Sequence, residues 1–275
     1  MMKEKYLPET YWEERFSKKL DLTSVGQRGL GYVYNRWLYR ARFHAMHRAL
    51  MRCNLDVSQK SIIDVGVGCG AWIPFWQKHN ISKIVGLDIT SASVCALGNR
   101  YPQYSFLKAD ICSTSKIPSE ETFDIVTAFD VLFHITNDSD FSNGILNLSK
   151  LLKRGGWLIL SDSFCKKSWG PFYHEYHRSY DDYLREFNSR SLKPVHIEPI
   201  FYTMATNICD FDSRYKRFIS QFTKIMLNIV SRLSSRPQTE WINHLIGFWL
   251  YILDCILFQI GRPGCSLKLL FVQKC

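Results

Sequence analysis

The fold of this chain is indicated most clearly by the segment Ile62-Ile-Asp64-Val-Gly66-Val-Gly68-Cys-Gly70-Ala71. Its apolar, β-branched start predicts a buried strand, and its glycines predict a sharp turn that opens a helix. A glycine has no Cβ, so a ligand can approach the backbone closely and meet the N–H groups of the helix N-terminus. The stretch also satisfies the dinucleotide pattern GxGxxG/A, which is weak evidence by itself. Asp64 favours a cationic ligand instead.

Outward from this stretch, short apolar runs alternate with segments of helical length. We expect strands at 61–65, 81–87, 104–107, 123–129 and 156–160, with helices such as 71–79 and 91–100 between them. Strands separated in this way indicate βαβ units and a parallel sheet. The remaining expected elements are a helix at 179–192 and strands at 199–206 and 266–273.

An aspartate ends or directly follows each of the first five expected strands: Asp64, Asp88, Asp110, Asp130 and Asp162. The carboxyl ends of the strands form one edge of an open α/β sheet, and ligands bind in the crevice there. Asp88 is placed to accept hydrogen bonds from both hydroxyls of a ribose. The sequence therefore predicts a ligand site on this edge.

Five segments in order resemble the class I S-adenosylmethionine-dependent methyltransferases: IIDVGVGCG from Ile62, IVGLDIT from Ile84, FLKADI from Phe106, FDIVTAFDVLFHI from Phe123 and LLKRGGWLILSD from Leu151. The resemblance covers about 61–165 and is greatest to the small-molecule branch, which includes quinone-biosynthesis and natural-product enzymes. It implies an α/β, Rossmann-like, doubly wound fold with a mostly parallel seven-stranded sheet, an N-terminal helical cap and a helical insert before the last strand. The expected domains are a cap at 1–60, the methyltransferase domain at 61–209 and 262–275, and the insert at 210–261.

The resemblance also implies S-adenosylmethionine (SAM) as cofactor and a role for each matching residue. The methionine part would be held by Asp64, Gly66, Gly68 and Gly70. The ribose and adenine would contact Asp88, Ile89, Asp110 and the backbone N–H of Ile111. The floor beside the sulfonium would be lined by Phe129 and Asp130. For Asp110 and Asp130 the alternative is helix N-capping after a strand.

Methyl transfer from a sulfonium is an in-line displacement in which the protein aligns the acceptor and excludes water. A hydroxyl acceptor must also lose a proton, and histidine is the side chain suited to that task near pH 7. The candidate bases are His134, after the fourth strand, and His174 and His177, after the fifth. Asp162 is a candidate orienting carboxylate. Packing for His134 and a surface loop for the other two histidines are the alternatives.

The net charge of +10 is concentrated in the flanks. Residues 1–60 hold 12 basic and 6 acidic side chains, whereas 61–165 hold 8 and 10. The densest basic run, 28–52, is interleaved with aromatic residues, and we read it either as a solvated helix with its aromatic side on the core or as a cap that meets an anionic partner. From this run we expect Tyr34, Arg36 and Trp37 to contact the acceptor.

Nine cysteines without a CxxC pair indicate neither a disulfide framework nor a zinc site. We expect no metal, because a helix N-terminus explains the acids Asp181 and Asp182 better. The first ten residues lack the apolar run of a signal peptide, so a reduced, cytoplasmic protein is expected. The stretch 241–260 is long enough to cross a bilayer, but polar residues such as Asp254 favour a buried helix.

We therefore expect a SAM-dependent methyltransferase that acts on a small-molecule, lipid-linked or diphosphate-linked acceptor, with oxygen as the favoured atom. An RNA methyltransferase using the Arg-rich cap is the alternative, and Val131-Leu132 after Asp130 argues against it, because amino-methylating nucleic-acid enzymes have Pro-Pro-aromatic there. A non-catalytic SAM-binding partner subunit is a third alternative. A homodimer and peripheral membrane contact both remain open, and nucleic acid is not an expected partner.

Overall fold

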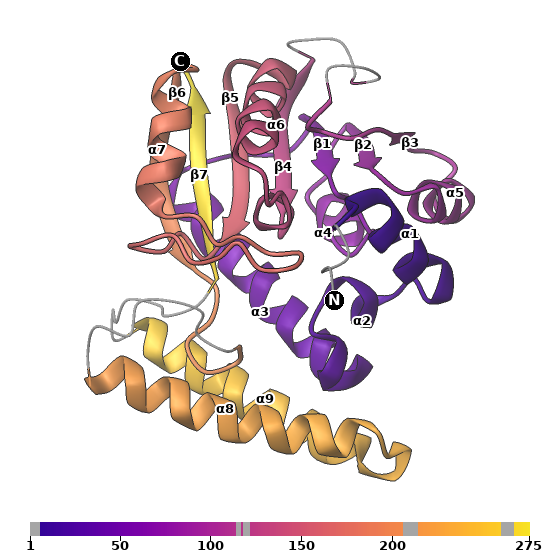
Figure 1. The fold of residues 1–275 in the computed structure, drawn as a ribbon, viewed down its shortest axis with the longest axis vertical. Helices are drawn as coiled ribbons and strands as arrows, with labels where there is room; N and C mark the ends of the chain where they lie inside the picture. Colours follow the sequence, from indigo (N-terminus) through magenta and orange to yellow (C-terminus); the bar gives the residue numbers. More distant parts are fainter. Residues whose placement is uncertain (1–5, 114–116, 118–121, 206–213, 260–266) are drawn as a thin grey trace, which may run out of the picture.

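The computed structural model describes residues 6–113, 117, 122–205, 214–259 and 267–275. At its centre is a seven-stranded sheet in the order β3-β2-β1-β4-β5-β7-β6 (Figure 1). All neighbouring strands from β3 to β5 pair in parallel, and β7 runs antiparallel to both β5 and β6. This confirms the predicted fold class. The strand bounds are β1 Ser61–Val65, β2 Lys83–Asp88, β3 Ser105–Lys108, β4 Phe123–Phe129, β5 Leu152–Asp162, β6 Leu192–Pro199 and β7 Lys268–Lys274.

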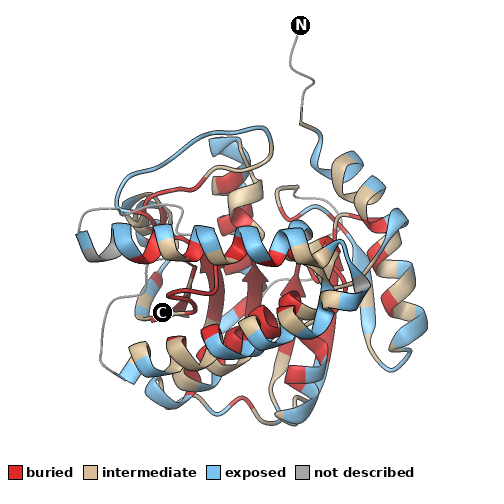
Figure 2. Cartoon of the chain, turned by 90° about the horizontal axis from the view of Figure 1, so that it is seen from below, coloured by how far each residue is buried: buried red, intermediate tan, exposed pale blue. Residues whose placement is uncertain are grey.

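Helices cover both faces of the sheet, and the sheet separates two apolar cores, one on each face. The central strands are almost wholly buried, as Figure 2 shows in red. Because buried parallel strands are apolar on both faces, they read as continuous hydrophobic runs in the sequence. The connecting helices are α4 Ile73–Lys78, α5 Ser91–Arg100, α6 Asp138–Leu151 and α7 Tyr180–Asn188, with a short 3-10 helix η2 at Leu132–His134.

The N-terminal segment forms α1 (Pro8–Lys18), α2 (Leu22–Val25), η1 (Arg28–Leu30) and the long α3 (Gly31–Arg52). An ion-pair cluster ties α3 to the sheet edge: the buried carboxylate of Glu198 in β6 accepts from Arg48 Nε at 2.8 Å and Arg52 Nη1 at 2.5 Å. A buried carboxylate needs such partners, because it is costly to remove from water unpaired. Two arginines of the basic run on α3 therefore hold the cap against the sheet.

The segment before β7 is a helical hairpin of α8 (Arg214–Ser234), η3 (Pro237–Thr239) and α9 (Glu240–Gln259). It packs against α3 below the sheet (Figure 1). The expectation of a buried helix at 241–260 is wrong for one of its faces, since Trp241 and Trp249 are exposed. The predicted domain boundaries at 209/210 and 261/262 lie outside the described residues.

Three further expectations are corrected. The predicted strand at 199–206 is instead β6 at Leu192–Pro199, and the predicted helix at 179–192 ends at Asn188. The apolar run 200–205 suggested a strand, but it is buried chain outside any strand. The strand β6 lies at the edge of the sheet, and its sequence contains polar residues that do not suggest a buried strand. Cys165 is disulfide-bonded, so the chain is not wholly reduced in this structure. The free cysteines among the described residues are Cys53, Cys69, Cys95, Cys112, Cys255 and Cys275.

Candidate functional site

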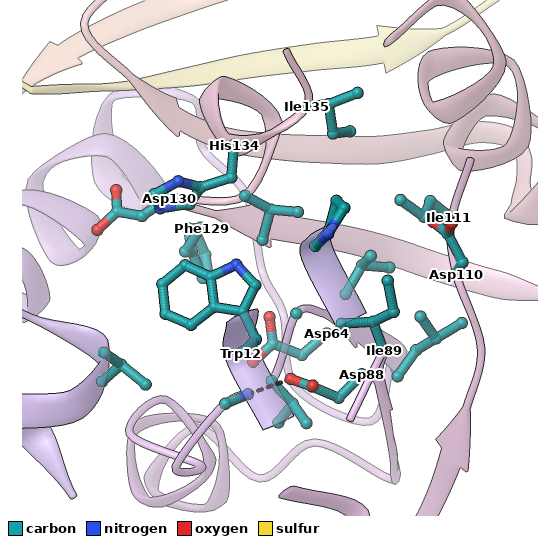
Figure 3. Close-up of a pocket in the computed structure, with 18 of the residues that line it drawn as sticks. Trp12, Asp64, Asp88, Ile89, Asp110, Ile111, Phe129, Asp130, His134 and Ile135 are labelled. Carbon is teal, nitrogen blue, oxygen red and sulfur yellow. Dashed lines mark hydrogen bonds between the residues drawn. The ribbon is translucent and has the colours of Figure 1, made fainter. Parts of the chain in front are cut away.

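A cavity of about 610 Å³ lies at the carboxyl ends of β1, β2 and β4, under α1 (Figure 3). It brings together most of the predicted cofactor residues: Asp64, Gly66, Gly68, Asp88, Ile89, Asp110, Ile111, Phe129 and Asp130. Gly70 does not line it. A Cβ on Gly70 would come within 2.7 Å of Leu97 Cδ2, so this glycine lets the loop pack on α5 instead.

The glycine loop follows β1 and is held in a backbone conformation that favours glycine. Gly66 has φ +71° and Gly68 φ +53°. A Cβ would lie 2.3 Å from Val131 Cγ2 at Gly66 and 2.8 Å from Val25 Cγ1 at Gly68. The loop therefore forms the close-fitting floor of the cavity, as its sequence predicts.

Asp88 ends β2 and fixes the glycine loop. Its Oδ2 accepts the Gly68 N–H at 2.9 Å (Figure 3), and its Oδ1 accepts the N–H and hydroxyl of Thr90 at 3.0 and 2.7 Å. A carboxylate has about four acceptor positions. The structure thus leaves room for one ribose hydroxyl on Asp88, where the sequence led us to expect two.

Asp64 is buried at the end of β1, and its Oδ1 accepts the Thr127 hydroxyl at 2.7 Å. Burial raises the pKa of Asp64 to about 7, an effect that the Thr127 hydrogen bond opposes and the charge of Asp88 reinforces. A cation that binds beside a buried carboxylate favours the charged form of that carboxylate. Asp64 therefore fits the ammonium group of a methionine moiety.

Asp130 and Asp110 have different environments. Arg42 Nη2 lies 2.6 Å from Asp130 Oδ2, and the Ser161 hydroxyl donates to Asp130 Oδ1 at 2.6 Å. The N-capping alternative for Asp130 is therefore wrong, because its carboxylate pairs with a residue of α3. Asp110 is exposed, and its Oδ1 accepts the Cys112 N–H at 2.9 Å. That bond closes a turn and caps no helix.

The cavity cover is α1, which lies within the predicted N-terminal cap at 1–60, although the residues predicted to contact the acceptor were on α3. Trp12 and Phe16 line the cavity from this helix, and Trp12 lies 4.9 Å from the His134 ring, centroid to centroid. The Glu13 carboxylate accepts the N–H groups of Ser91 and Ala92 at 2.6 and 3.0 Å. These N–H groups are at the start of α5, where backbone donors have no acceptor within the helix itself. Trp12 and Phe16 are four residues apart and therefore share one face of a helix, which is the sequence pattern that could have predicted that α1 packs inward.

His134, in η2, is the one candidate base that lines the cavity. Its Nδ1 lies 2.8 Å from the His174 carbonyl oxygen. Because a carbonyl can only accept, Nδ1 carries the proton and Nε2 keeps a free lone pair. Burial lowers the pKa of His134 to about 4 despite that hydrogen bond, so the ring is neutral at pH 7. The neutral His134 ring can therefore accept a proton or a hydrogen bond at Nε2.

His174, His177 and Asp162 lie outside the cavity, contrary to prediction. His177 is buried, with Nδ1 4.0 Å from Asp162 and Nε2 3.4 Å from Glu175. Burial alone would lower the pKa of His177, but the nearby carboxylates of Asp162 and Glu175 raise it to about 9. Asp162 also accepts from the Tyr183 hydroxyl. An already protonated imidazole cannot act as a base, so these groups stabilise the loop after β5.

Donor atoms of His134, His174 and Glu175 lie within 4.8 Å of one another. Imidazole and carboxylate together are a ligand set that suits several divalent metals. The expectation of no metal stays a prediction, and inhibition by a chelator would contradict it.

The predicted acceptor contacts on α3 are not at the cavity. Tyr34 is buried and donates its hydroxyl to the Met204 carbonyl at 2.9 Å, Trp37 packs on α9, and Arg36 is exposed. Residues three to four apart share a helix face, and the face toward the site instead carries Tyr39, which lines the cavity, and Arg42. The sequence identified the helix correctly but not the side of it.

Comparisons with known proteins agree with this geometry. The family described as "Methyltransferase domain" matches residues 62–156. The mitochondrial ubiquinone biosynthesis O-methyltransferase of Candida albicans is 34% identical over 113 residues, 39% of this chain and 33% of that protein. The mRNA cap guanine-N(7) methyltransferase of Schizosaccharomyces pombe is 30% identical over 110 residues, 36% of this chain and 30% of that protein. The match spans about a third of the length of these relatives.

Among solved structures, the cyclase SpnF superposes with a TM-score of 0.55 at 13% identity, over 84% of this chain and 80% of that one. A likeness at this identity concerns the fold alone, since one fold hosts many functions. Residues 62–156 hold the glycine loop, Asp88, Asp110 and Asp130, so the matched segment supplies the floor of the cavity. SAM is the cofactor of the matched family, and Asp64 and Asp88 fit its ammonium and ribose. Residues 62–156 therefore match a methyltransferase domain, and the chain around them has the fold of SAM-dependent methyltransferases.

Proposed function

We propose that this chain transfers the methyl group of SAM to a hydroxyl group on an uncharged, flat small molecule. The observation that carries the proposal is the free Nε2 of a neutral His134 at a cavity walled by aromatic side chains. The name of the O-methyltransferase relatives supports oxygen as the methylated atom.

When bound, SAM supplies an activated methyl group that leaves its sulfonium in an in-line displacement. Asp64 pairs with the ammonium group and Asp88 accepts from a ribose hydroxyl, so both fix the position of the donor. Trp12 and Phe16 exclude water from above. His134 Nε2 takes the proton of the acceptor hydroxyl as its oxygen bonds to the methyl carbon. The Nδ1–H bond to the His174 carbonyl keeps the ring oriented during the transfer.

The aromatic and uncharged side chains that line the cavity indicate which class of acceptor it would bind. Trp72 and Phe129 stack at 4.2 Å, and Tyr39 lines the same cavity, so the walls suit a planar ring. No Lys or Arg is among the described lining residues, and nearby Arg42 is paired with Asp130. We therefore favour an uncharged acceptor over the phosphate-bearing one considered from the sequence. The volume is within the usual range for small-molecule sites, about 300–1,000 Å³.

The direct test combines cofactor binding with transfer of a labelled methyl group. Calorimetry should give a one-to-one complex with SAM, and a panel of hydroxylated aromatic compounds should yield a methyl ether in which the label is on oxygen. Label on nitrogen or carbon would contradict the proposed atom. Cofactor binding without transfer to any acceptor would favour the alternative of a non-catalytic partner subunit.

The Glu13 carboxylate anchors α1 over the cavity, so Glu13→Ala should weaken SAM retention. Loss of a helix cap costs about 1 kcal/mol, which corresponds to roughly fivefold faster SAM dissociation if that cap closes the cover. Stopped-flow measurement of SAM release checks this. Glu14→Ala is the matched control, because Glu14 is the adjacent, exposed glutamate. Equal acceleration in both variants would contradict the anchoring role.

A further inference from the structure

The helix α9 exposes an apolar stripe to solvent. Its exposed members are Trp241, Leu245, Phe248, Trp249 and Ile256, which repeat at helical spacing along one face. Trp241 and Trp249 are 63% and 64% exposed. A contiguous apolar surface with tryptophans of this exposure marks an interaction site, whereas isolated exposed apolar residues do not.

The opposite face of α9 is fixed to the body of the protein. Asp254 is buried and accepts the N–H groups of Tyr202 and Thr203 at 2.9 and 2.7 Å. A Cβ on Gly247 would lie 2.4 Å from Trp37 Cδ1, so α9 also lies closely on α3. The helix is long and apolar enough to cross a membrane, and most of it is not buried in the structure. These contacts hold α9 lengthwise against the rest of the protein. In this arrangement the helix could lie along a membrane surface but could not cross the membrane.

The partner helix α8 adds positive charge. It exposes apolar residues such as Phe218 and Ile225 beside the exposed cations Arg217, Lys224 and Arg232. Its 21 residues, RYKRFISQFTKIMLNIVSRLS, include no Asp or Glu. Basic and apolar residues together on an exposed helix are the composition of elements that lie in the interface of an anionic membrane. Two copies of such a basic helix would repel each other.

We propose that the hairpin α8–η3–α9 is a docking surface for an anionic phospholipid bilayer. The apolar stripe of α9 enters the boundary between headgroups and acyl chains, and the cations of α8 contact lipid phosphates. Figure 1 shows the hairpin beyond the carboxyl ends of the parallel strands. Residues at these strand ends also line the cavity. Figure 2 looks at that side from below and shows exposed residues along its helices. The inference holds whichever acceptor the chain methylates.

Flotation of the full chain with vesicles tests the proposal. Vesicles of phosphatidylglycerol and phosphatidylcholine should carry the protein at least about tenfold more strongly than phosphatidylcholine alone, with binding that falls as salt rises. The double variant Trp241→Ser/Trp249→Ser should lose about tenfold or more in vesicle binding. Lys224→Gln should lose about fivefold, which corresponds to one cation at the membrane surface.

Met51→Ser is the matched control, because Met51 is 74% exposed on α3, outside the hairpin. It should bind vesicles like the wild type, and circular dichroism should show that all variants remain folded. Failure of the wild type to float with anionic vesicles would overturn the proposal, as would an equal loss in the Met51→Ser control. A dimer in sedimentation velocity that the tryptophan variant dissociates, without vesicle binding, would assign the stripe to a second copy instead.

Discussion

Replacing His134 by glutamine lowers kcat by about 10²–10⁴-fold, because general base catalysis contributes that much. SAM affinity should stay close to that of the wild type, since His134 is at the acceptor side in the proposed mechanism. Single-turnover rates with labelled SAM, together with calorimetric Kd values, separate the two quantities. A kcat within threefold of wild type would remove His134 from the mechanism.

His174→Gln is the control for this substitution. The His174 backbone carbonyl, which the substitution keeps, holds Nδ1 of His134, and the stacked His174 ring makes no hydrogen bond to it, so loss of the imidazole should leave kcat nearly unchanged. EDTA should also leave kcat unchanged. Equal losses in the two variants, with inhibition by EDTA, would indicate a metal held by His134, His174 and Glu175 in place of a base.

The pH profile gives a second check on His134. Its pKa, lowered by burial to about 4, leaves the base form in excess at every pH above that value. We therefore expect kcat/KM for the acceptor, measured at saturating SAM, to be flat from pH 6 to 8 and to fall only below about pH 5. An acid limb of kcat/KM near pH 6.5 would instead point to an ordinary, solvated histidine.

Asp64→Asn should have opposite effects on binding and stability. Removing the negative charge leaves the ammonium of SAM unpaired, and truncating one partner of a buried charge pair costs about 2–5 kcal/mol, so Kd should rise at least about thirtyfold. In the wild type, SAM affinity should also weaken below pH 7, because Asp64 must lose its proton to pair with the ammonium. Calorimetry at pH 5.5, 7 and 8.5 measures both effects.

Without SAM, the same substitution should stabilise the protein at pH 8. The folded pKa of Asp64, about 7, is above its unfolded value, so the folded state binds the extra proton and stability falls as pH rises from about 4 to 7. Above pH 7 this cost is on the order of 2–4 kcal/mol, and an amide does not incur it. Urea unfolding at pH 5 and pH 8 should show a smaller difference for the variant.

Asp124→Asn is the matched control for Asp64. Asp124 is near the start of β4, and hydrogen bonds from Ser61, with support from Lys153, outweigh burial and lower its pKa to about 2. Its stability contribution is present at neutral pH and is lost as pH falls, so the amide should destabilise the protein at pH 7 and leave SAM affinity unchanged. Similar behaviour of both variants would contradict a special role for Asp64.

The floor of the cavity could be predicted from sequence because local rules determine it. Buried parallel strands read as apolar runs, and each ends in a polar residue at a known edge, which is how Asp64, Asp88 and Asp130 were found. The edge strand β6 was missed for the same reason, since an edge strand carries polar residues and the apolar run after it is buried irregular chain.

The sequence predicted an N-terminal cap at 1–60 but not which of its residues line the cavity, because long-range contacts determine that. Glu13 bonds to backbone groups 78 residues away, and nothing in α1 alone indicates that partner. The rotation of α3 depends on its packing against α9 and β6, so its Arg-rich, aromatic composition did not distinguish Tyr39 and Arg42 from Tyr34 and Trp37. The composition of α3 therefore indicated the correct helix but not which of its faces lies toward the cavity.

The cover by α1 has a kinetic consequence. Trp12 and Phe16 border the same cavity as Gly66 and Asp88, so a single helix stands over both the donor and the acceptor positions. Movement of this helix would open both positions at once, and such gating steps often limit turnover. Product release would then be slower than methyl transfer, which would give a burst of methylated product in the first turnover.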